Sequence, residues 1–412
     1  MGVATFLAAP AVPAQAANEA VDDIVAVLRD RGLIDEATEQ QILAKDAAYA
    51  KKMKEDAPLS GWSLKGDLRV RYEDFDWDDR DPDRRGRFRL RGRLAAKKMI
   101  NERIEFGFRL ATGTDHNSAN QTFDDSFDKY SFDLDRLYVK LKLGETLGGK
   151  GSLTAGKMSN PFTWKNGKDY LLWDGDLNPE GFLYKGDWKV GGGSKLALST
   201  GVFMLEEDSG QTDDPILYAA QLVGEHKFEG GKFGWRLSGY QYSDLDDGGK
   251  FYGKTVDSDE GNLINAFDDG EARIVEAAAY AKFGGGDWPV LIYGSLINNT
   301  TADDMLLADG TQLDEENQAY GIGVEFGSSK KVAKLGLGYF EVEANAVIKH
   351  FTDSDLFDGE TNRKGWALYA SKQVAKGTEL KLTIFDGEGL EEEFAKADAE
   401  RTRIQADVQF KF

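Results

Sequence analysis

The last ten residues of the chain alternate strictly between polar and apolar side chains. Residues 403–412 read R-I-Q-A-D-V-Q-F-K-F, with an apolar residue at every even position. Because successive side chains of a β-strand point to opposite faces, this pattern predicts a strand with one apolar face and one wet face. The pattern runs to Phe412, so we expect this strand to be paired along its length, either at the edge of a soluble sandwich or at the closing seam of a membrane β-barrel.

Composition removes several classes of protein from consideration. The chain has 412 residues, 41% of them hydrophobic, yet no apolar run reaches the ~18 residues that a membrane-spanning helix requires. Cysteine is absent, which removes a disulfide scaffold and a thiolate metal site. The net charge of -21 would repel phosphate groups, so we expect no nucleic acid among the partners. A few soluble domains or one large barrel would both suit this length.

The N-terminus has the features of an export signal. Residues 1–16 are largely apolar and end in Ala14-Gln15-Ala16, the small-x-small pattern of a signal-peptidase site. We expect residues 1–16 to be a signal peptide that is removed, although the start of an apolar helix would look the same. Export without membrane helices or cysteine predicts the periplasm or the outer membrane of a two-membraned bacterium.

Residues 17–58 have the period of an α-helix. Apolar residues recur at helical spacing over 21–28, Gly32 stands where that helix would stop, and Asp35 is a suitable N-cap for a second helix. The sequence predicts a helical hairpin in the periplasm that self-associates between subunits or packs beneath a barrel. A solvated charged spacer is the alternative.

From Trp62 onward the period changes to two and stays there. About sixteen segments have the pattern of a strand, and an even number is expected of a single-chain bacterial barrel. Their connections alternate in length almost throughout, with short links such as 376–377 separated by long ones such as 244–272. A barrel with short periplasmic turns and long outer loops requires that parity, whereas a soluble sandwich does not. The predicted strands fall at 62–73, 87–99, 102–112, 133–143, 150–158, 181–187, 194–204, 216–228, 232–243, 273–283, 289–298, 318–327, 333–344, 365–374, 378–386 and 402–412.

We therefore predict an all-β fold, a 16-stranded antiparallel transmembrane β-barrel over residues 60–412, preceded by the short N-terminal α-helical segment in the periplasm. Two of the predicted strands are irregular. The strand at 333–344 loses its alternation after Tyr339, which suggests a β-bulge, and the strand at 289–298 is apolar on both faces.

The first four predicted strands indicate what lines the lumen. In the strand at 87–99, Phe88, Leu90 and Leu94 share the face that we assign to lipid, and arginines fill the other face. An Arg or Lys that faces lipid at the bilayer midplane costs ~2–4 kcal/mol, so these cations are expected in a polar lumen. They would form a pore-lining ladder or simply pair with carboxylates of the wall. The predicted ladder consists of Arg69, Arg71, Arg87, Arg89, Arg91, Arg93, Arg103, Arg109, Arg136 and Lys140.

The link between the fifth and sixth predicted strands combines Gly156, Asn160-Pro161 and the run Trp173-Asp174-Gly175-Asp176. In this link and in its architecture, the chain resembles the trimeric general-diffusion porins, and most closely the bacterial putative porin family. The resemblance implies that an outer loop at about 158–180 folds into the lumen and narrows it. The acidic loop motif of the enterobacterial porins is absent. The implied constriction has Asp169, Asp174 and Asp176 on its acidic side and Arg69, Arg89, Arg91, Arg109 and Arg136 on its basic side.

Opposed rows of charge in a narrow, water-filled gap orient dipolar solutes and let small hydrophilic molecules pass down their gradients. We therefore expect an outer-membrane porin for the passive diffusion of small hydrophilic solutes and ions. The arginines favour anions, whereas Glu225, Glu276 and Glu325 oppose that preference, so the sign of the selectivity stays open. The alternative function is a structural anchor or adhesin whose barrel is plugged and whose loops bind a partner.

No catalytic, cofactor or metal site is predicted. None of the three histidines stands beside a nucleophile and an orienting group, so we expect no enzyme and no cofactor. Asp74, Asp76 and Asp78 copy the start of an EF-hand calcium loop but lack its glycine and its final bidentate acid. We expect a solvated acidic loop there, which divalent cations could bridge to lipopolysaccharide.

The remaining expected partners follow from the resemblance. They are outer-membrane lipids, two further copies of the chain in a homotrimer, small hydrophilic solutes, and the barrel-assembly machinery, which would recognise the terminal strand through Phe410 and Phe412. Small residues on a predicted outer face, Ala277, Ala279 and Ala281, would permit close contact between barrels or would face lipid.

Overall fold

The computed structural model describes residues 14–55, 60–78, 81–113, 115, 117–124, 126–164, 166–207, 209, 214–245, 250–251, 254–255, 271–306, 312–391 and 400–412. The chain divides into a small unit that ends at Ser63 and a large unit over Leu64–Phe412, and each is described by itself. Most of the predicted signal peptide lies outside the described residues. Among the helices that are described, none combines the length and the apolar character needed to cross a membrane.

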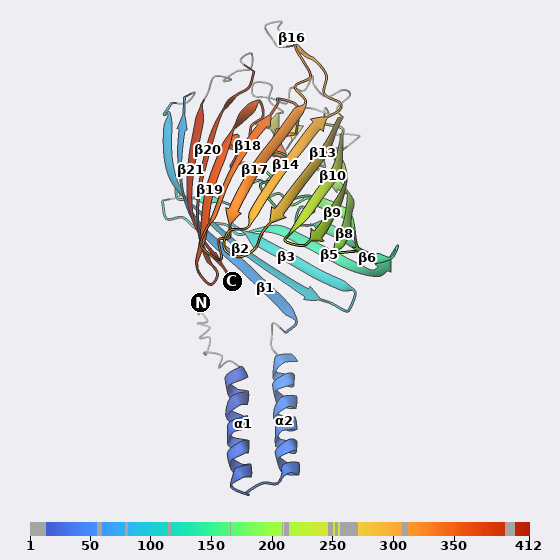
Figure 1. Cartoon of the computed structure of the whole chain (residues 1–412), viewed down its shortest axis with the longest axis vertical. Helices are drawn as coiled ribbons and strands as arrows, with labels where there is room; N and C mark the ends of the chain where they lie inside the picture. Colours follow the sequence, from blue (N-terminus) through green and yellow to red (C-terminus); the bar gives the residue numbers. More distant parts are fainter. Residues whose placement is uncertain are drawn as a thin grey trace. The chain divides into compact units, whose positions relative to one another are not determined.

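The small unit contains two helices, α1 (Ala14–Asp30) and α2 (Glu36–Glu55), which are drawn in blue in Figure 1. Gly32 follows α1 with a φ of +67°, the left-handed conformation that commonly ends a helix. Asp35 caps α2, because its Oδ1 accepts the backbone N–H of Thr38 at 2.8 Å. The two predicted helices are therefore confirmed, and their location in the periplasm stays a prediction.

The large unit is a closed antiparallel barrel of sixteen long strands, as the sequence predicts (Figure 1). Long strands that follow one another in the chain pair with one another. The terminal strand closes the barrel by pairing with the first, with Leu68 opposite Phe410 and Trp77 opposite Arg401. The long strands are β1 (Trp62–Trp77), β2 (Arg84–Met99), β3 (Ile104–Ala111), β5 (Asp133–Thr146), β6 (Gly149–Lys157), β7 (Glu180–Gly191), β8 (Ser194–Met204), β9 (Ile216–Phe228), β10 (Gly231–Ser243), β13 (Ala272–Phe283), β14 (Val290–Asn299), β17 (Gln318–Gly327), β18 (Lys334–Val342), β19 (Arg363–Ala375), β20 (Thr378–Gly389) and β21 (Arg401–Lys411).

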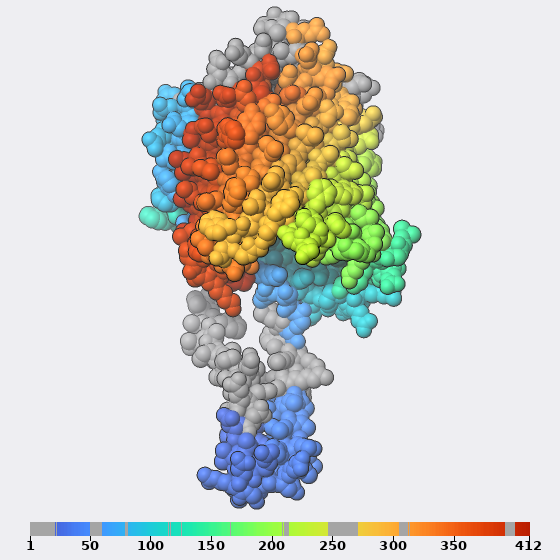
Figure 2. Space-filling model, viewed as in Figure 1, coloured from blue at the N-terminus to red at the C-terminus, as the bar shows by residue number. Residues whose placement is uncertain are grey.

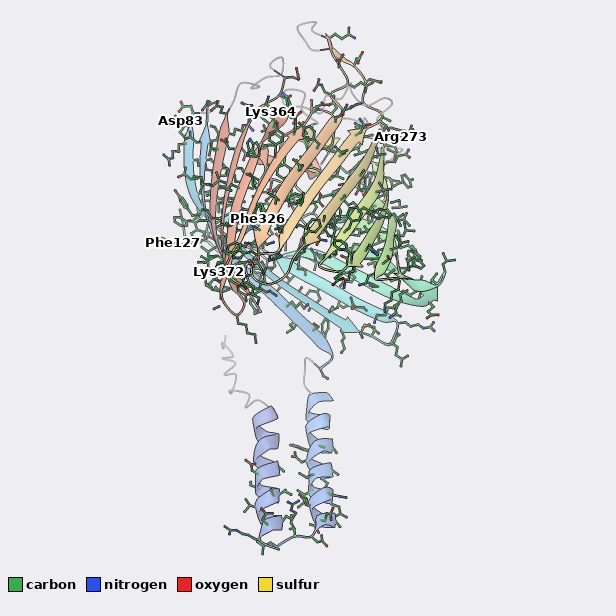
Figure 3. All side chains as sticks on the ribbon, viewed as in Figure 1. Asp83, Phe127, Arg273, Phe326, Lys364 and Lys372 are labelled. Carbon is green, nitrogen blue, oxygen red and sulfur yellow. The ribbon has the colours of Figure 1, made fainter. Side chains whose placement is uncertain are left out.

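The two ends of the barrel differ, as the alternation of link lengths predicts. We call them the turn end, where β1 begins and β21 ends, and the loop end. In Figure 3, Arg273 and Lys364 mark the loop end, and Phe326 and Lys372 mark the turn end. A two-residue strand, β4 (Gln121–Thr122), lies in the loop-end link between β3 and β5 and pairs with β2. The turn-end links cover residues 100–103, 147–148, 192–193, 229–230, 284–289, 328–333 and 376–377.

The outer wall of the barrel is apolar. Along β13, Val275 and its alternate neighbours face outward, whereas Ile274 and Glu276 are buried. The orange and red C-terminal strands form one continuous face in the space-filling view (Figure 2). Large apolar side chains are exposed on many strands of this wall, among them Phe88, Phe182, Leu237, Leu296, Ile322 and Leu382. A lipid environment accounts for such a wall, because a soluble monomer rarely exposes so large an apolar surface.

The two irregular strands have a common explanation. The register of β18 against β19 is unbroken from Lys334 to Val342, so the bulge predicted after Tyr339 is wrong. Phe340 instead faces inward and is buried, and β14 likewise turns Tyr293 and Ile297 inward to buried positions. Alternation is lost in these strands because the lumen beside them is filled with apolar side chains, which makes both faces of the strands apolar.

Candidate functional site

A row of cations lines the inner face of β1, β2, β3 and β5. The period of two turns the odd-numbered arginines of β2 away from Phe88 and Leu94, and therefore into the barrel. Arg71 at 1% exposure and Arg89 at 8% are buried, whereas other cations of these strands, such as Arg93, are partly exposed to solvent. Arg103 is exposed in the 100–103 turn, so the structure does not bring it to this row. We call the following residues the basic row: Arg69, Arg71, Arg87, Arg89, Arg91, Arg93, Arg109, Arg136 and Lys140.

Carboxylates of the same wall neutralise part of the basic row. Asp67 accepts from Arg91 at 3.0 Å and from Arg93 at 2.8 Å. Glu73, which is fully buried, accepts from Arg87 at 2.8 Å, and Asp135 pairs with Arg109. Pairing within the wall, the alternative that the sequence left open, therefore applies to these arginines.

The link between β6 and β7, residues 158–179, crosses the lumen, and we call it the bridging segment. The N–H of Met158 donates to the carbonyl of Pro179 at 2.9 Å, which closes the base of the link. Phe162 packs on β8 and β10, with ring centroids 5.8 Å from Phe203 and 5.5 Å from Tyr240. Farther along, Tyr170 packs on β18 and β20, with ring centroids 5.4 Å from Phe340 and 5.6 Å from Phe385. Through Phe162 and Tyr170, the bridging segment thus contacts the wall opposite the basic row.

The three predicted acidic residues of this segment have different partners. Asp176 contacts the basic row, with Oδ1 at 2.9 Å from Arg93 and 3.8 Å from Arg91. Asp169 instead accepts two hydrogen bonds from Arg236 of β10, at 2.5 and 2.8 Å. Asp174 pairs with no cation within 4 Å in the described part of the chain. Of the three, the structure therefore brings Asp176 alone to the basic row.

Asp174 connects the bridging segment to a second inward link. It accepts the backbone N–H groups of Asp176 at 2.7 Å and of Ser354 at 2.8 Å, and its own N–H donates to the carbonyl of Phe351 at 2.6 Å. Burial, together with the negative charge of Asp176, raises the pKa of Asp174 to about 7. Near neutral pH this carboxyl is therefore partly protonated.

The second inward link, residues 343–362 between β18 and β19, is absent from the sequence-based prediction. Its Asp355 accepts from Arg71 at 2.9 Å and from Arg403 at 3.0 Å. Burial opposes ionisation of Asp355, but the guanidinium groups of Arg71 and Arg403 outweigh it and hold its pKa well below the usual value. The available signal was the cluster of apolar residues in the run A-N-A-V-I-K-H-F at 344–351, because a loop exposed to solvent rarely carries such a cluster.

Asp355 completes a buried ionic network at the seam of the barrel. Arg71 donates to Asp407 of β21 at 2.6 Å and to Glu73 at 3.1 Å, and Arg403 donates to Glu73 at 2.7 Å. Such charges are stable in the interior only when each has partners, and here every member has at least one. The network fixes the second inward link to the strands that close the barrel.

A third link, between β3 and β5, also contributes to the lumen. Its Asn120 accepts from Arg69 through Oδ1 at 2.5 Å and from Arg89 through the backbone carbonyl at 3.2 Å. The N–H of Ala119 donates to Asp176 at 3.2 Å. Three links from the loop end therefore meet beside the basic row.

Asn178, which the sequence-based prediction also lacks, holds the end of the bridging segment. Its Oδ1 accepts from Arg136 at 2.6 Å and from Arg109 at 3.4 Å, and its Nδ2 donates to Asp135 at 2.6 Å. An amide supplies both a donor and an acceptor, so it can bind both members of an ion pair.

Apolar packing fills the part of the lumen that lies against β8, β10, β13, β14 and β18. Trp173 lies between Tyr240 and Phe351, with ring centroids at 5.3 and 5.7 Å. The buried members of this apolar cluster include Phe162, Leu171, Leu172, Trp173, Leu217, Ile274, Ile297, Phe340, Val347 and Ile348. Buried aromatic and aliphatic side chains hold the bridging segment to this side, which leaves polar, partly exposed groups along the basic row.

The remaining predicted residues lie away from the lumen. Asp74 pairs with Arg84 at 3.0 Å, and Asp76 and Asp78 are exposed. Within the described ranges, no three acidic or histidine side chains are grouped to hold a metal ion. Phe412 closes the seam through its backbone, exchanging hydrogen bonds of 2.9 and 3.1 Å with Gly66, and Phe410 pairs with β1 as described above.

Comparison with known proteins agrees with this architecture. The barrel is similar to OprB of Pseudomonas putida, with a TM-score of 0.54 and 10% sequence identity over 89% of this chain and 97% of that one. It is also similar to OmpF of Salmonella typhi in complex with daunomycin, with a TM-score of 0.51 and 11% identity over 85% of this chain and 97% of that one. At such identities the likeness shows the fold alone. No curated protein matches the sequence.

A family model described as "Putative porin" matches residues 78–248 and 272–412, which is more than half of the chain. Porins are channels rather than enzymes, and a β-barrel porin belongs to the bacterial outer membrane. With its sixteen strands, its apolar outer wall and its charged inner wall, the chain belongs to the putative porin family.

Proposed function

We propose that the protein is an open outer-membrane porin, through which small hydrophilic solutes and ions diffuse passively. The observation that carries the proposal is the division of the lumen into two sides. The apolar cluster occupies one side, while residues of the basic row such as Arg69, Arg93 and Arg136 stay partly exposed on the other. A water-filled path along the basic row is the arrangement in which these charges are least costly.

The bridging segment would set the width of that path. On the loop-end side, a cavity of about 420 Å³ is lined by Thr112, Asp135, Asp176 and Asn178. Asp176, which lines this cavity, pairs with Arg93 at 2.9 Å and so ties the bridging segment to the basic row. The charges that stay partly exposed along the basic row favour dipolar and charged solutes over apolar ones, which must disturb ordered water to pass.

The assembly and its surroundings are proposed with the function. An outward groove of about 1000 Å³ contains the small residues Ala277, Ala279 and Ala281 between Leu237 and Leu296, which supports close contact between barrels of a homotrimer. The turn end would face the periplasm together with the helices, and the loop end would face lipopolysaccharide. The strand ending in Phe412 would engage the barrel-assembly machinery.

Liposome swelling tests the proposed function. Purified protein in liposomes should admit small sugars and amino acids at rates that fall steeply with solute size. A large oligosaccharide in the same liposomes is the control, because it should stay excluded. If a correctly folded barrel gave no swelling with any solute, the open-porin proposal would be wrong.

One observation favours a second function, a closed barrel that acts as an anchor for its loops. The apolar cluster and the buried ionic network together hold two links inside the barrel. If those links closed the lumen completely, the loop end would be the functional surface. The swelling experiment separates the two functions, because a closed barrel gives no permeation.

A further inference from the structure

The carboxylates that face the lumen are largely neutralised. Asp176 lies between Arg91 and Arg93, and Asp355 between Arg71 and Arg403. The acids that have a cation within 4 Å also include Asp67, Glu73, Glu105, Asp135, Asp169, Glu225, Glu276, Glu325 and Asp407. Except where Asp169 and Glu276 share the single cation Arg236, their negative charge is therefore cancelled at short range and contributes little to the field in the passage.

Several cations lack such neutralisation. In the described part of the chain, no carboxylate oxygen lies within 4 Å of Arg69, Arg136, Lys140, Lys168 or Lys381, and all five are partly exposed to solvent. Three of them interact with a neutral group. Arg69 donates to the Asn120 amide at 2.5 Å, Arg136 donates to the Asn178 amide at 2.6 Å, and Lys168 lies 4.2 Å from the Tyr369 ring centroid. We call these five residues the unpaired cations.

Three of the unpaired cations adjoin one another across the seam of the barrel. Arg71, Asp407 and Lys381 stand opposite one another on β1, β21 and β20, and Arg69 is the next inward residue of β1. Lys168 reaches this region from the bridging segment, and Lys381 is the cation that repels it most. Desolvation and this repulsion lower the pKa of Lys168 to about 7, so this group is partly deprotonated near neutral pH and a bound anion would favour its charged form.

In the described ranges of the chain, two acids of the inward links, Asp174 and Asp353, have no cation within 4 Å. Burial and the neighbouring negative charges raise the pKa of Asp174 to about 7 and raise that of Asp353 well above its usual value. Because protonation reduces the charge of these two carboxyls, they offset only part of the charge of the five unpaired cations. Among the lumen residues that the structure describes, the unbalanced charge is therefore positive, although the whole chain carries -21.

We propose that the passage is selective for anions, and that Arg69, Lys168 and Lys381 form a binding site for small solutes bearing carboxylate or phosphate groups. The inference rests on the proposed function, because it requires an open passage. Guanidinium and ammonium groups bind both kinds of oxyanion through charge-assisted hydrogen bonds. Arg69 already donates one hydrogen bond to the Asn120 amide oxygen, and an oxygen of a bound solute can take the place of that amide oxygen.

The test is the reversal potential of the full-length protein in planar bilayers under a potassium chloride gradient. Wild type should have a chloride-to-potassium permeability ratio above one. Inorganic phosphate added to the bath should reduce the chloride current. The variant with Arg69→Gln, Lys168→Gln and Lys381→Gln should shift the ratio toward or below one and lose the phosphate effect.

Two controls make the result specific. Lys330→Gln removes an exposed cation in the turn between β17 and β18 and should change neither readout. Lys168→Arg with Lys381→Arg keeps the charge and should keep anion preference, which separates charge from folding. Cation preference in wild type, or an unchanged ratio and phosphate effect in the triple variant, overturns the inference and leaves the porin intact. A folded barrel without current overturns the proposed function, and this inference with it.

Discussion

Phe162 is the most deeply buried of the described side chains of the bridging segment and packs on the wall. It is 1% exposed and contacts Phe203, Tyr240 and Trp173. Phe162→Ala removes the ring and leaves a cavity, which costs ~3–5 kcal/mol in a well-packed core. Because each 1.4 kcal/mol is a factor of ten, the segment should detach about a hundred-fold more often or more.

Two readouts follow from that release. Hydrogen exchange at residues 162–177 should accelerate by about the same factor, and single-channel currents should become larger and noisier as the lumen widens. The matched control is Phe182→Ala, which removes the same ring from the outer wall, where it is 70% exposed. Unchanged exchange and current in Phe162→Ala, or equal effects in both variants, would refute the idea that apolar packing holds the segment in the lumen.

Of three further predictions, two concern the inward links and one concerns β6, the strand that leads into the bridging segment. Asp355→Asn leaves Arg71 with one fewer buried partner and should lower the free energy of unfolding by up to ~3–5 kcal/mol, measured by urea denaturation in micelles. The pKa of Asp174 is raised to about 7 from an unfolded value near 4, so docking of the bridging segment should weaken as pH rises from about 4 to about 7, by at most ~1.4 kcal/mol per pH unit. Hydrogen exchange of the segment should therefore depend on pH in this range, and Asp174→Asn should abolish that pH dependence. Gly156→Ala places a Cβ against the Leu137 carbonyl at a φ of +107°, so it should cost at least ~1–3 kcal/mol and reduce the heat-resistant folded fraction on gels.

The barrel was predictable because its rules are local. A period of two assigns Phe88 to lipid and Arg89 to the lumen without knowledge of any other strand, and the alternation of short and long links orders the hairpins. Both rules act on every strand, so the errors at the strand ends are small. The strand predicted at 102–112, for example, begins at Ile104, and Arg103 falls in the turn.

The interior was predicted less well because it depends on contacts distant in sequence. The partner of Asp169 is Arg236, and the partner of Asp355 is Arg403. Neither pairing can be predicted from the residues that lie near either partner in the sequence. The loss of alternation after Tyr339 was a real feature of the strand. It indicates apolar contacts inside the barrel, not a β-bulge. An inward-facing Phe340 on a barrel strand indicates that a loop packs against it.

Single-channel recording of the purified wild-type protein distinguishes an open barrel from a closed one. We expect discrete openings in a lipid bilayer, because the apolar cluster fills one side of the lumen and the proposed passage runs along the basic row on the other. Openings in groups of three would add support for the trimer. A correctly folded barrel that conducts no current over the whole voltage range would contradict the open passage and show that the inward links close the lumen.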